Sequence, residues 1–276
     1  MLNIGNVNTL TILRITSVGM YLSDEENNEV LLPNKYILPE FKVGNEAEVF
    51  IYKDSEERLI ATTLEPFIKL NEFAFLQVKE SNQVGAFLNW GLEKDLFVPF
   101  KEQPVKMIAG KRYVVYLYLD AGTERLTASG KIYKFLDNSE LEIQEDDTVD
   151  LLIYKESAMG FSAIINNKYD GLIYHNEIFQ EIYVGDKIKG YIKSIREDHK
   201  IDLRLQQSGY KNIEPNSEVI LKYLQMHNGF LDLNDKSDPE EISQRLSMSK
   251  KTFKKAIGGL YKQQLIELRQ DGIYLL

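Results

Sequence analysis

Aromatic and basic side chains cluster after glycines that stand in similar sequence contexts. Phe87 follows Gly85 by two residues, and Trp90, the only tryptophan, and Lys94 come shortly after it. The candidates after a second such glycine, Gly160, are Phe161, Tyr174, His175, Lys193, Arg196 and Arg204. Aromatic rings stack on nucleic-acid bases, and basic side chains contact phosphates. These residues predict a surface for single-stranded nucleic acid, although an aromatic ring in a small barrel more often belongs to the core.

Tyr21 holds the same place after a third glycine, Gly19. Its surroundings are acidic, because residues 1–66 contain 5 Lys and Arg against 11 Asp and Glu. Negative charge repels a phosphate backbone. Tyr21 is therefore expected to contribute less than Phe87 or Phe161.

A lysine-rich segment near the C-terminus offers a different chemistry. Lys250, Lys251, Lys254 and Lys255 follow Ser249, and no acidic residue occurs before Gln264. At helical spacing Lys250 and Lys254 share a face, as do Lys251 and Lys255. Such a face is suited to phosphate contact, although lysine runs are often only solvated. The paired Gly258 and Gly259 predict a kink or a close-packing point in this helix.

The glycines that precede the aromatic residues belong to an internal repeat. Gly19, Gly85 and Gly160 are each followed 25 residues later by another glycine, Gly44, Gly110 and Gly185. Around them lie five short stretches of alternating apolar residues per unit, separated by turn residues. Units of about 65 residues with this pattern predict five-stranded barrels of the OB type rather than βαβ units. We therefore expect a mainly β chain with three such barrels in tandem.

The last segment changes character and predicts a winged helix. The stretch from Ser217 has helical spacing, Asp238 and Pro239 form a helix start, and Ser249 can cap a third helix. Two strand-like runs follow, joined at Asp271-Gly272. The predicted domains are residues 1–66, 67–140 and 141–213 for the barrels, and 214–276 for the α+β winged-helix domain.

Composition excludes several classes of function. The 276 residues contain no cysteine and carry a net charge of −9, so thiolate chemistry is excluded and indiscriminate phosphate binding is disfavoured. No apolar run reaches the roughly 18 residues of a membrane span, and the expected location is cytoplasmic. His175, His199 and His227 lack metal-ligand spacing, and no phosphate loop or nucleophile elbow occurs. We expect no cofactor, no metal and no enzymatic activity.

The second and third units resemble the S1 RNA-binding domain, in the runs VGAFLNWGLEKDLFVP and DGLIYHNEIF. Three such units followed by a winged helix are similar, over essentially the whole chain, to the CvfB/YitL family of bacterial proteins. The resemblance implies RNA binding and a regulatory role in gene expression. It places the family's base-stacking aromatic on Phe87 and Tyr21, whereas the third unit has Ser162 there. The family's histidine falls on Tyr174 in the third unit.

The leading hypothesis is a bacterial regulator that binds single-stranded RNA through its barrels, with the winged helix extending the site. One alternative is a DNA-binding transcription regulator that uses the lysine-rich helix. Another is a scaffold for ribosomal or transcription proteins, docked through the acidic first unit. Preference for a DNA sequence would favour the first alternative, and co-purification after nuclease treatment would favour the second.

Overall fold

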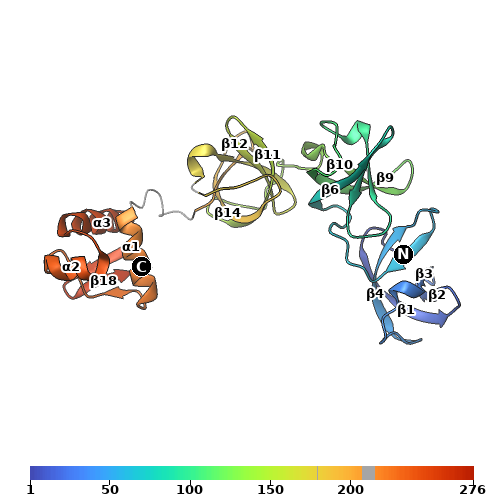
Figure 1. The fold of residues 1–276 in the computed structure, drawn as a ribbon, viewed down its shortest axis with the longest axis horizontal. Helices are drawn as coiled ribbons and strands as arrows, with labels where there is room; N and C mark the ends of the chain where they lie inside the picture. The colour runs from blue at the N-terminus through green and yellow to red at the C-terminus, as the bar shows by residue number, and fades with distance from the viewer. Residues whose placement is uncertain (179, 207–214) are drawn as a thin grey trace. The chain divides into compact units, whose positions relative to one another are not determined.

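The computed structural model of the chain describes residues 1–178, 180–206 and 215–276 (Figure 1). It divides into two compact units, Met1–Leu203 and Arg204–Leu276. The domain boundary expected between residues 213 and 214 lies outside the described residues. Within the described ranges, no helix is both long and apolar enough to cross a membrane.

Two groups of five strands in the first unit, barrel 1 and barrel 3, each close into a barrel. Barrel 1 contains β1 (Val7–Ile15), β2 (Gly19–Ser23), β3 (Glu29–Pro33), β4 (Glu46–Lys53) and β5 (Leu59–Thr62). Barrel 3 contains β11 (Thr148–Ser157), β12 (Gly160–Ile165), β13 (Tyr169–Tyr174), β14 (Lys187–Ile195) and β15 (Ile201–Arg204). In each barrel a parallel pairing, β3 with β5 or β13 with β15, closes an otherwise antiparallel set of ladders.

Between them in sequence lies a five-stranded sheet, sheet 2, which Figure 1 draws in green. It contains β6 (Phe73–Ser81), β7 (Gly85–Asn89), β8 (Leu96–Pro99), β9 (Arg112–Asp120) and β10 (Arg125–Ser129). Its strand order is β10-β9-β6-β7-β8. This order matches that of barrels 1 and 3, except that the third and fifth strands of the group are not paired. In this fully described segment β8 and β10 lie beside each other without the parallel ladder that closes barrels 1 and 3.

The repeated glycine allows the second and third strands of each group to approach closely. A Cβ atom on Gly19, Gly85 or Gly160 would lie 2.1, 2.4 or 1.9 Å from a carbonyl oxygen of the next strand. All three residues have positive φ, from 153° to 159°, which side chains rarely tolerate. Glycine is therefore required where each second strand begins, which explains why every repeat has a glycine at this position.

Short helical turns follow the third strand of each group. They are the 3-10 helices η1 (Asn34–Tyr36), η2 (Phe100–Glu102) and η4 (His175–Glu177). A further turn, η3 (Ile132–Lys134), follows β10. Each of η1, η2 and η4 comprises three residues, so a single turn and not an α-helix follows each third strand.

The apolar core of sheet 2 is continuous with side chains of barrel 1. Phe50 and Tyr52 of β4 are 2% exposed and belong to the same buried cluster as Trp90 and Leu92. A second cluster joins sheet 2 to barrel 3 and includes Phe73, Val114, Leu152 and Ile164. The side chain of Asn167 adds polar links, because it accepts from the Phe73 amide and donates to the Asn71 carbonyl, at 3.1 and 2.9 Å. Neighbouring groups of strands are therefore packed together within this unit.

The C-terminal unit has the predicted order of helices followed by a hairpin. Its elements are α1 (Pro215–Met226), β16 (Phe230–Leu231), α2 (Pro239–Leu246), α3 (Lys250–Lys262), β17 (Ile266–Arg269) and β18 (Gly272–Leu275). Asp238 caps α2 by accepting from the Glu240 amide at 2.8 Å, and Ser249 caps α3 by accepting from the Thr252 amide at 3.1 Å. The strand β16 was not predicted; it pairs with β18 and widens the hairpin into a three-stranded sheet.

The mainly β architecture with five-stranded groups and a C-terminal winged helix is confirmed. Closure differs from the expectation of three equal barrels, since barrels 1 and 3 close by hydrogen bonding and sheet 2 does not. The expected close-packing point at Gly258 and Gly259 is wrong. Both residues lie inside α3, and a Cβ atom on either would meet nothing within 4 Å.

Candidate nucleic-acid interface

Phe87 lies on the outward face of β7, half-buried, as a base-stacking residue requires. It pairs across the sheet with Phe97 of β8, and the two ring centroids are 5.2 Å apart. Both rings line a cavity of about 540 Å³, a volume in the range of ligand pockets. Phe97 was not among the predicted site residues, although the alternation of apolar residues in DLFVP indicates its outward position.

Trp90 requires a correction, because its side chain is a core residue. It is 2% exposed and packs edge-to-face against Phe50 and Tyr52, with ring centroids 5.9 and 6.1 Å away. Its indole Nε1 donates to the Lys94 carbonyl at 2.5 Å. The ring borders the cavity beside Phe87 but is too enclosed to stack on a base. Its burial depends on barrel 1, which the local sequence does not reveal.

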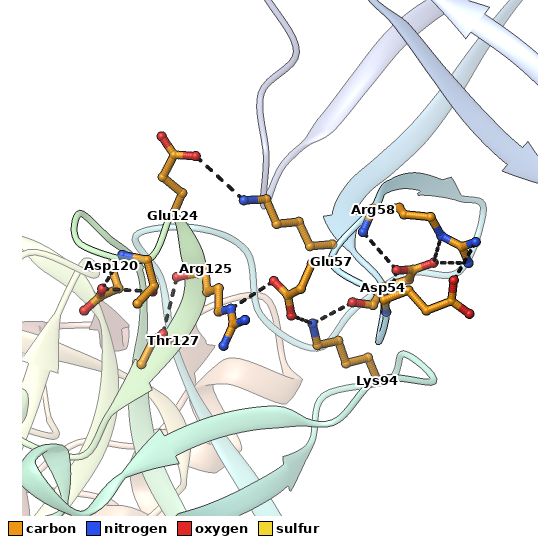
Figure 2. Close-up of polar contacts among 11 residues, drawn as sticks. Asp54, Glu57, Arg58, Lys94, Asp120, Glu124, Arg125 and Thr127 are labelled. Carbon is orange, nitrogen blue, oxygen red and sulfur yellow. Dashed lines mark hydrogen bonds and ion pairs between the residues drawn. The ribbon is translucent and has the colours of Figure 1, made fainter.

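Lys94 links sheet 2 to barrel 1. Its Nζ donates to the Asp54 carbonyl at 2.7 Å and to Glu57 Oε1 at 3.1 Å. Arg125 Nε donates to the other oxygen of Glu57 at 2.9 Å, so one carboxylate holds two cations (Figure 2). The hydrogen bond from Lys94, ahead of the smaller contribution of Arg125, keeps the pKa of Glu57 below its usual value. Arg125 and Glu57 were not among the predicted site residues, since only the fold brings them together.

Tyr21 is half-buried on β2, and a cation lies over its ring. The Arg14 guanidinium carbon is 4.3 Å from the ring centroid, and the same side chain forms two hydrogen bonds with Glu29, of 2.7 and 2.6 Å. Tyr21 borders a second cavity of about 770 Å³. The two cavities share the lining residues Tyr52, Ser55, Glu93 and Lys94. They therefore adjoin each other where barrel 1 meets sheet 2.

Phe161 also requires a correction, because it faces the interior of barrel 3. It is 9% exposed, and its ring meets that of His175 edge-on at 5.9 Å. Strand faces alternate, and the next residue, Ser162, takes the outward position. Ser162 lies opposite Lys155 just after a break in register, as Phe87 lies opposite Glu80. Barrel 3 therefore has no aromatic ring at the position equivalent to Phe87.

Tyr174 and Arg196 are brought together at one end of barrel 3. Arg196 Nη2 donates to the Tyr174 hydroxyl at 2.6 Å, and its guanidinium also pairs with Asp202 at 2.9 Å. His175 is exposed, and its Nε2 lies 3.1 Å from the Ser157 carbonyl oxygen. These residues form an accessible polar and aromatic edge.

The remaining cations of barrel 3 are less accessible than expected. Lys193 Nζ pairs at 2.7 Å with Glu177, whose side chain is 9% exposed. Arg204 is only 7% exposed, so the expectation that it contacts a nucleic-acid backbone is wrong.

The lysines of α3 lie opposite its buried face. Phe253, Ala256, Ile257 and Leu260 pack inward, which leaves Lys251, Lys254 and Lys255 exposed. Lys250 is half-buried and donates to the Lys236 carbonyl at 3.2 Å, and Lys254 lies 3.9 Å from Asp235. Glycines 258 and 259 leave the middle of this helix without side chains. The result is a basic helical surface of the kind that contacts phosphates.

Comparison with known protein families identifies both kinds of domain. Residues 4–64 match the S1 domain, and residues 218–275 match the CvfB-like winged helix domain. The S1 match falls on the acidic barrel 1, whereas the resemblance to this domain in the sequence lies in the second and third units. Among the described residues, no group of three or more His, Asp or Glu side chains is placed to hold a metal ion.

Individual relatives extend the similarity to nearly the whole chain. The uncharacterized protein YitL of Bacillus subtilis (strain 168) is 30% identical over 264 residues, covering 92% of this chain and 87% of YitL. Conserved virulence factor B of Staphylococcus epidermidis (strain ATCC 35984) is 23% identical, covering 99% of this chain and 94% of its own. A crystal structure of a Streptococcus pneumoniae multidomain protein with nucleic acid binding domains covers 99% of this chain and 98% of its own, at 24% identity and a TM-score of 0.48.

Proposed function

Because the chain belongs to the family of YitL and conserved virulence factor B, we propose that it is an RNA-binding regulator of gene expression. Single-stranded RNA binds to the outward faces of the five-stranded groups, and the winged helix extends the site through its lysines. Sheet 2 acts as a third OB-type barrel, since the OB fold is itself a partly open five-stranded barrel. The protein acts by binding and not by catalysis.

One observation carries this proposal: the Phe87–Phe97 ring pair lies beside Lys94 and Arg125 along one cavity. Proteins that bind single strands combine stacking rings with cations that follow the backbone. The S1 domain and the winged helix, both frequent in nucleic-acid-binding proteins, support the same class of ligand.

The net charge of −9 limits the strength of backbone contact. Binding without strong electrostatic attraction relies on stacking and on several weak sites acting together. The protein is therefore expected to prefer flexible single strands, whose bases are free to stack, over duplex RNA.

Duplex DNA is the second candidate ligand, because the exposed lysines of α3 occupy the helix that enters the major groove in winged-helix proteins. The side chains that usually read bases, Arg, Asn and Gln, are absent from Lys250–Lys262. Contact with the DNA backbone is therefore favoured over recognition of a particular sequence.

Fluorescence anisotropy tests the proposal. The purified protein is titrated against labelled single-stranded RNA, duplex RNA and duplex DNA at several salt concentrations. Tighter binding of the single strand, weakened by salt, is the expected result. Failure to bind any of the three at micromolar protein would reject the proposal and would direct the search to a protein partner.

A further inference from the structure

The 540 Å³ cavity is composite, since its walls come from both barrel 1 and sheet 2. Sheet 2 supplies the Phe87–Phe97 ring pair and two cations, Lys94 and Arg125. Barrel 1 supplies Glu57, which lies in the loop between β4 and β5 with a left-handed backbone (φ 64°). Loops at this place, together with the second and third strands, form the ligand-binding surface of OB folds.

Glu57 pairs with both cations of the cavity. Its carboxylate accepts from Lys94 at 3.1 Å and from Arg125 at 2.9 Å, one contact on each oxygen (Figure 2). A phosphodiester group of a nucleic-acid backbone has the same net charge as this carboxylate, and it likewise offers two charged oxygens that accept hydrogen bonds. The side chains of Glu57, Lys94 and Arg125 are 38%, 32% and 56% exposed, so the three charges remain accessible from solvent.

We propose that this cavity is a single-stranded polynucleotide subsite that spans barrel 1 and sheet 2, and that Glu57 is an internal competitor for its phosphate. The ring pair stacks a base, and Lys94 and Arg125 hold the adjoining phosphate once it displaces the Glu57 carboxylate. This inference rests on the nucleic-acid binding proposed above. It adds the composite site, and it assigns the acidic barrel 1 a role in restraining the affinity.

The direction in which one substitution changes the affinity for the strand separates this arrangement from a purely structural ion pair. Glu57→Gln removes the competing charge and is expected to increase affinity about two- to fivefold, the range that corresponds to an exposed ion pair. Glu48→Gln is the matched control, because Glu48 is exposed on β4, carries the same charge and lines neither cavity. If the gain in affinity came only from the less negative net charge, both variants would bind the strand equally tightly.

The ring pair has its own matched variants. Phe97→Leu places on β8 the residue that barrels 1 and 3 carry at the equivalent register, Leu31 and Leu172, so the sheet is expected to tolerate it. Phe100→Leu is the control, since Phe100 is 43% exposed and does not line the cavity. Loss of affinity is expected for Phe97→Leu and not for Phe100→Leu.

Trp90 provides a readout confined to this cavity. It is the only tryptophan of the chain and borders the cavity, so its fluorescence reports occupancy here and not on the winged helix. The chain of 276 residues is titrated with oligouridylate and with oligothymidylate, while the anisotropy of labelled strands records total binding. We expect the tryptophan fluorescence to change together with the anisotropy for at least one of the two strands. The affinity obtained from it should be higher for Glu57→Gln and lower for Phe97→Leu.

The outcomes separate the two proposals. Strand binding with an unchanged Trp90 signal, or binding by Glu57→Gln that is no tighter than binding by Glu48→Gln, would overturn the composite subsite and leave RNA binding intact. If neither the tryptophan fluorescence nor the anisotropy showed binding of either strand, RNA binding itself would be overturned, together with the subsite.

Discussion

Phe97 lies directly opposite Phe87 in the ladder between β8 and β7. In barrel 1 the equivalent pair is Tyr21 with Leu31, and in barrel 3 it is Ser162 with Leu172. Sheet 2 is therefore the group of strands in which two aromatic rings stand side by side on this face. Differences between the repeats, and not the repeat itself, determine where stacking is strongest.

Phe87→Ala tests the stacking role. Loss of a ring that stacks on a base is expected to weaken single-stranded RNA binding by about 1–3 kcal/mol. Anisotropy titration gives the affinity, and circular dichroism verifies that the variant is folded. A folded variant with unchanged affinity would remove Phe87 from the site.

Phe161→Ala is expected to act on stability instead. Its ring is 9% exposed in barrel 3, and truncation of a buried phenylalanine usually costs about 3–5 kcal/mol. Urea unfolding followed by circular dichroism measures the loss. A stable variant with weaker RNA binding would show that the ring faces the ligand after all.

Charge removal on α3 tests the basic helical surface. Replacing Lys251, Lys254 and Lys255 by glutamine should reduce the slope of log affinity against log salt by about 0.7 for each lost contact with a single strand. Binding is measured by anisotropy at several salt concentrations. Lys222→Gln on α1, whose lysine pairs with Glu218 at 2.8 Å, serves as the control. Equal slopes for all proteins would mean that α3 does not touch the backbone.

Gly258→Ala is expected to stabilise the C-terminal unit by about 0.5–1 kcal/mol. The added methyl group meets nothing within 4 Å, and alanine favours a helix interior more than glycine does. Gly85→Ala provides the contrast, since its Cβ would lie 2.4 Å from the Val98 carbonyl oxygen. Chemical denaturation of the two variants should give shifts of opposite sign, and a destabilised Gly258→Ala would contradict the open geometry of α3.

Asp170 makes the stability of barrel 3 dependent on pH. Burial raises its pKa above 3.8, against the opposing effect of the hydrogen bond that Tyr154 donates to it at 3.0 Å. With a folded pKa above the unfolded one, its contribution is present below the unfolded value and lost as pH rises through the folded value. Asp170→Asn should therefore gain stability over the unaltered protein as pH increases from about 4 to about 7. Thermal unfolding at both pH values measures this, and a constant difference would contradict the raised pKa.

Local sequence patterns predicted the elements well where backbone chemistry alone determines them. Gly19, Gly85 and Gly160 begin the second strand of each group because no side chain fits there. Asp238 and Ser249 begin α2 and α3 because each satisfies a free amide at a helix start. These signals lie within a few residues of the structure that they determine.

Candidate site residues were predicted less well, because accessibility depends on distant parts of the chain. Trp90 is enclosed by Phe50 and Tyr52, about forty residues earlier in sequence. Phe161 follows its glycine by one residue, whereas Tyr21 and Phe87 follow theirs by two. Because side chains alternate between the two faces of a strand, Phe161 lies on the inward face. Arg125 meets Glu57 across 68 residues, a relationship that no local pattern encodes.

The core that barrel 1 shares with sheet 2 limits how far the first two repeats can be treated as interchangeable modules. A chain starting at residue 67 would lack Phe50 and Tyr52 and would expose Trp90, which is 2% exposed in the intact protein. Burial of that apolar surface couples the melting of the two repeats, so they should unfold together as one cooperative block. Repetition in sequence thus coexists with interdependence in folding, and loss of the first repeat would also weaken the second.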